Sequence, residues 1–187
     1  GLVKLLDAPS PSVRIAAVRT AGLWKLEDTR QRLTAWATAA DTPSDLRQAA
    51  LAGLVSLGGN ASRSAIESVL QLDRPRDVRV QAVTALSNID VKAAAKHAVE
   101  LLKTWPAGEN PSLVLAPFLE LKNGPESLTA ALADQKLPPD VAKLSIRAVA
   151  TSGRDLPELG KALVSAGGLT GMPQPLSAAE MSQLVTA

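Results

Sequence analysis

Arginine recurs at a regular spacing in this sequence, accompanied by aspartate. Arg14, Arg47 and Arg79 follow one another at intervals of 33 and 32 residues. Asp41 and Asp73 stand six residues before the second and third of them. A planar guanidinium with five N–H donors binds a carboxylate or a phosphate through two parallel hydrogen bonds. The pattern therefore predicts either a structural row of arginine–aspartate pairs or a groove that grips phosphates.

The charge balance favours the structural interpretation. The formal net charge is +2, from 20 basic and 18 acidic residues. So small an excess produces no strong field toward a polyanion or an anionic membrane. Aromatic residues, on which unpaired bases stack, make up only 2% of the chain. We therefore expect the arginines to pair with Asp41 and Asp73, and we expect neither nucleic acid nor a membrane as the partner.

Other residues that could carry chemistry are scarce. Cysteine is absent, which excludes disulfides, thiolate metal ligands and a thiol nucleophile. The one histidine, His97, is expected on a helix surface, off the apolar face. Motifs for a nucleophilic serine, a dinucleotide or a nucleoside triphosphate do not occur. We expect no catalytic residue, metal or cofactor in this chain.

Two tryptophans and one asparagine have more than one interpretation. We expect Trp24 and Trp36 to be core residues of adjacent helices, because large aromatic side chains are usually buried. Asn60 begins Asn-Ala-Ser, which fits an N-glycosylation sequence. It also follows two glycines at a predicted helix start, so a helix N-cap is the simpler interpretation. Whether Asn60 is modified stays open.

The arginines belong to a segment that recurs five times. Its copies begin 33, 32, 34 and 29 residues apart, at Pro11, Ser44, Arg76, Asn110 and Pro139. Within the first three copies, apolar residues recur at i, i+3, i+4 and i+7, as on one face of a helix. Ser, Thr or Asn followed by Pro precedes several copies and indicates an N-cap with Pro in the first turn.

A second set of helices is expected between these copies, near residues 28–40, 61–72, 91–104, 125–134 and 155–166. The chain is rich in Ala and Leu, the best helix formers. Paired helices repeated about every 33 residues predict an all-α solenoid of about five hairpins. Pro117 stands inside the fourth copy and should bend that helix or loosen its packing.

The unit resembles a HEAT repeat, which has an A helix, a turn with Asp, and a B helix that opens with Val-Arg-x-x-Ala. Val13-Arg14, Leu46-Arg47 and Val78-Arg79 match this opening. The resemblance implies a right-handed α-α superhelix of the HEAT or armadillo-like type over residues 1–166. It also implies a buried ladder formed by Arg14, Asp41, Arg47, Asp73 and Arg79.

The pattern weakens toward the C-terminus. The copy at Asn110 has no Arg in register, and Ala142 stands where the fifth copy should have one. The ladder should therefore hold only the N-terminal half. After Ala166 we expect a Gly/Pro linker over 167–175 and a capping or connecting helix over 176–187. Because the chain opens at Gly1 without an initiator Met, we expect it to be a segment of a longer protein.

The resemblance implies a non-catalytic interaction or spacer module. Its concave B-helix surface would bind a protein or neighbouring domains of the same chain, and the module would be a monomer. The sequence also resembles the HEAT segment of large exported bacterial proteins that join a dehydrogenase-like domain to a c-type cytochrome, which implies a periplasmic spacer. The alternatives are a free-standing adaptor, a lyase-like or chaperone-like partner binder, and a nucleic-acid-binding HEAT-like protein.

Overall fold

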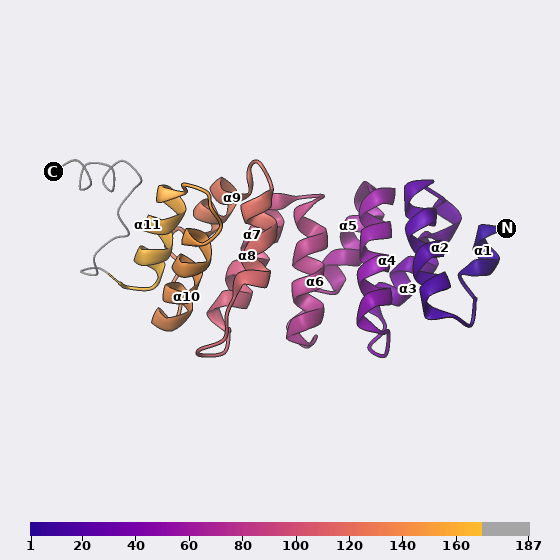
Figure 1. The fold of residues 1–187 in the computed structure, drawn as a ribbon, viewed down its shortest axis with the longest axis horizontal. Coiled ribbons are helices and arrows are strands. Elements are labelled where there is room, and N and C mark those ends of the chain that lie inside the picture. Colours follow the sequence, from indigo (N-terminus) through magenta and orange to yellow (C-terminus); the bar gives the residue numbers. More distant parts are fainter. Residues whose placement is uncertain (170–187) are drawn as a thin grey trace. The chain divides into compact units, whose positions relative to one another are not determined.

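The computed structural model describes residues 1–169 (Figure 1). These residues form eleven α-helices and one short 3-10 helix, without a β-strand. The helix expected at 176–187 and most of the linker expected at 167–175 lie outside the described residues. In chain order the helices are α1 (Leu2–Leu5), α2 (Pro11–Leu23), η1 (Glu27–Thr29), α3 (Arg30–Thr38), α4 (Ser44–Leu57), α5 (Gly59–Ser68), α6 (Arg76–Ser87), α7 (Val91–Lys103), α8 (Ser112–Glu120), α9 (Gly124–Leu132), α10 (Pro139–Ala150) and α11 (Pro157–Ala166).

The predicted all-α fold of packed helical hairpins is confirmed. The five repeated segments become α2, α4, α6, α8 and α10, which we call the B helices. The helices between them, the A helices, lie within four residues of the predicted ranges. Helix α5 begins at Gly59, with Gly58 as its N-cap, so the prediction that Asn60 is the cap is wrong. Asn60 lies exposed in the first turn.

The helices form two compact units, which divide between Asp90 and Val91. In the first unit the B helices α2, α4 and α6 lie side by side, and α3 packs against α5 (Figure 1). In the second unit the A helices α7, α9 and α11 pack in sequence, and α8 packs against α10. Each unit thus stacks like helices on like helices, as hairpin repeats do.

The second and third B helices begin one residue later than predicted, because their prolines are the N-caps and not the first helical residues. Pro43 and Pro75 are themselves the N-caps of α4 and α6, with ψ of 143° and 145°. Their carbonyls accept the first helical hydrogen bonds, from the N–H groups of Arg47 and Arg79. Proline suits this position because a cap needs no N–H of its own. Only α2 has Ser as the cap and Pro at the first helical position.

Pro117 does not loosen the packing of α8, so that part of the prediction is wrong, while the bend stays a prediction. The helix continues to Glu120, and the neighbouring side chains of Leu115 and Phe118 are fully buried. Proline lacks the N–H that would bond to the carbonyl of Leu113. Leu113 lies on the exposed side of the helix, where water can satisfy that carbonyl.

Two glycines set the distance between α2 and α4. A Cβ atom added at Gly22 would lie 2.9 Å from the Cα of Gly53. A Cβ added at Gly53 would lie 2.8 Å from Leu33 and 3.7 Å from Val18. The approach of Gly22 to Gly53 is shorter than a normal van der Waals contact, so α2 and α4 pack backbone to backbone here. The short approach of Gly53 is to Leu33 of α3, whereas its distance to Val18 of α2 is an ordinary contact.

Gly22→Val tests this contact. We expect the variant to lower the free energy of unfolding by about 1–3 kcal/mol, because the new side chain forces the two helices apart. Gly160→Ala is the control, since nothing lies within 4 Å of its added Cβ. That variant should instead gain about 0.5–1 kcal/mol from the better helix propensity of Ala. Urea unfolding followed by circular dichroism measures both, and equal effects would contradict the close contact.

Candidate interaction surface

Two of the three repeated arginines, Arg14 and Arg47, bind carbonyls at or just after the ends of helices. Arg47 is buried on α4, and its Nη2 donates hydrogen bonds to the carbonyls of Ala39 and Ala40 at 2.7 and 3.3 Å. These residues follow α3, whose last carbonyls have no partner within the helix and carry the negative end of its dipole. Arg14 on α2 donates in the same way to Ala8, just after α1, at 3.1 Å. Each arginine therefore ties the start of a B helix to the end of the A helix before it.

The predicted pairing with aspartate is not observed. Asp41 and Asp73 are exposed, and within residues 1–169 no ion pair joins either of them to a repeated arginine. The open carbonyls at the end of an A helix already supply acceptors for Arg14 and Arg47, so these need no carboxylate brought into the interior. Arg79 is also buried, on α6, and its Nε has no hydrogen-bond partner in this part of the chain.

Three further arginines, which the sequence analysis missed, bind helix ends. Arg74 Nη1 donates to the carbonyl of Thr38, the last residue of α3, at 2.7 Å. Arg30 Nη1 donates to Gly58, the C-cap of α4, at 2.9 Å. In the second unit, Arg154 donates to the carbonyl of Leu119 near the end of α8. These arginines share no repeated motif, and the available signal was only that Arg74 and Arg154 stand in turns just before a helix.

The exposed side of the first three B helices is small and nearly neutral. We call it the B-helix surface; it consists of Arg19, Leu23, Gln48, Ala52, Ser56, Thr84 and Asn88. The hydroxyls of Ser56 and Thr84 donate to carbonyls of their own helices at 3.1 Å. This surface therefore offers few free donors. Besides Arg19, the exposed charged side chains of these helices are Asp45, Arg76 and Asp77, in the first turns of α4 and α6.

Leu23 and Trp24 form an exposed apolar pair at one end of this surface. Leu23 is 77% exposed and Trp24 is 67% exposed, so the prediction that Trp24 lies in the core is wrong. The cause is the way that α2 ends. Lys25 has φ of 52°, and Leu26 donates its N–H back to the carbonyl of Ala21 at 3.0 Å. This left-handed turn folds Leu26 toward the helix and leaves Trp24 outside.

Trp36 lies half-buried on α3, so it belongs only partly to the core. The guanidinium of Arg32 lies over its ring, 5.3 Å from the centroid. Arg32 also forms an ion pair with Asp7, in the turn after α1. This chain of contacts joins two successive repeats of the first unit.

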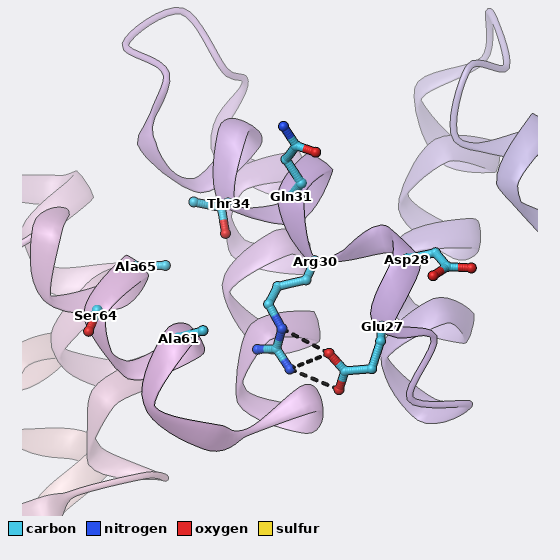
Figure 2. A pocket seen from close by; sticks show the side chains of 8 residues that line it. All are labelled: Glu27, Asp28, Arg30, Gln31, Thr34, Ala61, Ser64 and Ala65. Atoms are coloured by element: carbon cyan, nitrogen blue, oxygen red, sulfur yellow. Dashed lines mark hydrogen bonds and ion pairs between the residues drawn. The ribbon is translucent and has the colours of Figure 1, made fainter.

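The A-helix side of the same unit has an open hollow between α3 and α5 (Figure 2). Glu27 faces Arg30 and binds it with both carboxylate oxygens at 2.7–2.9 Å, while Asp28 points away. Arg30 also donates to Ser62. The hollow is lined on the α3 side by polar residues such as Gln31 and Thr34, and on the α5 side by the small residues Ala61, Ser64 and Ala65.

Arg63 joins α5 to the end of α6. It binds Glu67 at 2.8 Å and Asp90 at 2.9 Å. The hydrogen bond and charge of Glu67, followed by those of Asp90, raise the pKa of Arg63 above its ordinary value. Both pairs are open to solvent, so they add little to stability.

The described residues provide no grouping for metal chemistry. No three or more acidic or histidine side chains gather around a common point within residues 1–169.

His97 lies half-buried on α7, rather than fully on the surface. No helix in this range has both the length and the apolar character needed to cross a bilayer. In the second unit, the exposed B-helix residues include Leu113 on α8 and Lys143 on α10.

Arg47→Met separates the observed contact from the predicted pairing. It leaves the carbonyl of Ala40 without this donor and that of Ala39 with only the 3.4 Å bond from the N–H of Thr42, and we expect a loss of about 1–3 kcal/mol in the free energy of unfolding. Asp41→Asn should change stability by less than about 0.5 kcal/mol, because Asp41 is exposed and unpaired with Arg47. Thermal or urea unfolding of both variants decides the matter. Equal losses would favour an arginine–aspartate ladder instead.

Comparison with known families is consistent with this architecture. Residues 1–87 match the family model of HEAT repeats. No curated protein matches the chain. The matched range covers the three B helices that carry a repeated arginine and ends at the last residue of α6. Together with the packed helical hairpins, the match supports HEAT repeats in residues 1–87.

Proposed function

We propose that this chain is a non-catalytic protein-interaction module whose contact with its partner is centred on Leu23 and Trp24. HEAT repeats suggest a protein-interaction or scaffold role. The observation that carries the finer proposal is the exposure of these two large apolar side chains beside the neutral B-helix surface.

The chemistry of the pair fits a contact point. Tryptophan and arginine are enriched among the residues that dominate binding energy at protein interfaces. Arg19 lies one helical turn before Leu23 on the same exposed side of α2. The neighbouring positions on α4, such as Ala52 and Ser56, are small and uncharged. A partner can therefore approach α4 closely while it covers Trp24.

The expected partner is a protein, or a neighbouring domain, with a pocket for an indole ring. The low net charge of the chain supports this choice over a polyanion. A nucleic-acid binder remains the alternative from the resemblance, and a salt-dependent gel shift with duplex DNA would support it. A coloured partner that copurifies with the chain would instead support the lyase-like or chaperone-like alternative.

Trp24→Ala combined with Leu23→Ser tests the contact point. We expect the variant to lose at least about tenfold in affinity for a partner captured by the unmodified chain, since hot-spot residues each contribute about 2 kcal/mol or more. Leu72→Ser is the matched control, because Leu72 is equally exposed but lies in the turn before α6. Affinity is measured by surface plasmon resonance. Equal binding by all three proteins would contradict the proposal.

The finer hypothesis places the module between an oxidising domain and a c-type cytochrome domain in an exported protein. It is carried by the sequence resemblance alone, and the HEAT match does not address it. Sequencing the parent gene tests it. A Cys-x-x-Cys-His motif shortly after Ala187 would support a spacer in an electron-transfer protein. A stop codon there, with a start codon just before Gly1, would support a free-standing adaptor.

A further inference from the structure

Arg79 is a buried cation for which the described part of the chain supplies no hydrogen-bond acceptor. Its side chain is 8% exposed, and no hydrogen bond or ion pair joins it to another residue within 1–169. Arg47 holds the same fourth position in its own helix, is also buried, and binds two carbonyls. A buried charge without a partner is costly. The burial of Arg79 therefore points to an acceptor that approaches from outside.

The turn before α6 differs from the turn that supplies the acceptors of Arg47. Arg47 binds the carbonyls eight and seven residues before it, and the same count from Arg79 gives Gln71 and Leu72. The carbonyl of Gln71 already accepts the N–H of Arg74 at 3.1 Å. The turn is also longer, with residues 69–75 in place of 39–43, and Gln71 and Leu72 are exposed. This part of the turn therefore lies at the surface, away from the buried guanidinium.

The guanidinium of Arg79 can be reached from solvent beside the start of α6. Of its three nitrogens, only Nε is a fully enclosed atom without a partner, so the two Nη atoms keep access to solvent. Side chains in the first turn of a helix point back toward its N-terminus. The N-cap of α6 is Pro75, which offers no side-chain acceptor to the first N–H groups. Arg79 and the positive end of the helix dipole thus serve one region.

We propose that Arg79 and the first N–H groups of α6 bind a single carboxylate, supplied by an acidic side chain of a partner protein. A guanidinium and a helix N-terminus both donate hydrogen bonds to an oxyanion. The neighbouring charges favour a single negative charge. Arg74 and Arg76 bring two positive charges, and these are balanced by two negative ones from the exposed Asp73 and Asp77. The charge of Arg79 is what remains, and one carboxylate neutralises it.

The Nε–Hε resonances of arginine in the nitrogen-labelled full chain report on this site, and the test does not depend on the contact point at Trp24. Sodium acetate is the probe, and sodium chloride at the same ionic strength is the reference. We expect acetate to shift the Arg79 resonance until it saturates, and chloride to move it far less, because chloride lacks a planar pair of oxygens. Arg47 is the internal control. Its Nε is equally enclosed without a partner, but its Nη2 is already bound, so its resonance should stay in place.

Sodium phosphate is the third arm of the titration. A shift of the Arg79 resonance with phosphate but not with acetate would overturn the assignment to a carboxylate. Equal shifts of Arg79 and Arg47, or no shift with either oxyanion, would overturn the site itself.

Arg79→Met gives a second, independent readout. The variant loses no internal hydrogen bond, so its melting temperature in chloride should stay the same or rise, whereas that of Arg47→Met should fall. Acetate should raise the melting temperature of the unmodified chain but not that of Arg79→Met, since a ligand stabilises only the protein that binds it. The missing resonance in this variant also assigns Arg79. A variant that fails to fold, or melts as low as Arg47→Met, would reveal an acceptor inside the chain and overturn the proposal.

Discussion

The fold of the first unit depends on guanidinium groups that bind the open carbonyls at helix ends. An α-helix leaves its last four carbonyls without internal partners, and a buried end must find donors elsewhere. Arg14 and Arg47 reach back to the A helix of their own hairpin, and Arg74 reaches to that of the preceding hairpin. In Arg47 a single guanidinium nitrogen, Nη2, serves two carbonyls, those of Ala39 and Ala40.

The last copy with a repeated arginine ends close to two other boundaries in the chain. The copies with a repeated arginine end with α6, the HEAT match ends at residue 87, and the first compact unit ends at Asp90. Beyond this point the repeated arginine is absent, although Arg154 still binds the carbonyl of Leu119 near the end of α8. Ala142 stands in place of the arginine, and Gly167 packs so close to it that an added Cβ would lie 2.4 Å from the Cβ of Ala142. The carbonyl of Ala166 at the end of α11 accepts a backbone N–H, that of Leu137, at 2.8 Å.

The use of arginine inside the unit also shapes its exterior. Because Arg47 and Arg79 are buried, the exposed side of the B helices lacks the row of cations that their spacing could have placed there. What remains exposed is small and polar, except for the apolar pair at the end of α2.

The sequence by itself determined the helices, their pairing and the repeat, because apolar periodicity and proline positions act locally along the chain. It also identified Arg47 and Arg79 as interior residues. It could not identify the hydrogen-bond acceptors of the arginines. Every residue has a backbone carbonyl, so no sequence pattern indicates which carbonyl is bound, whereas the aspartates recur at a constant spacing and suggested themselves as partners. The exposure of Trp24 was likewise decided by the tertiary structure. A left-handed turn at Lys25 directs Leu26, not Trp24, against the helix, and side-chain size alone does not predict which of two neighbouring apolar residues a turn buries.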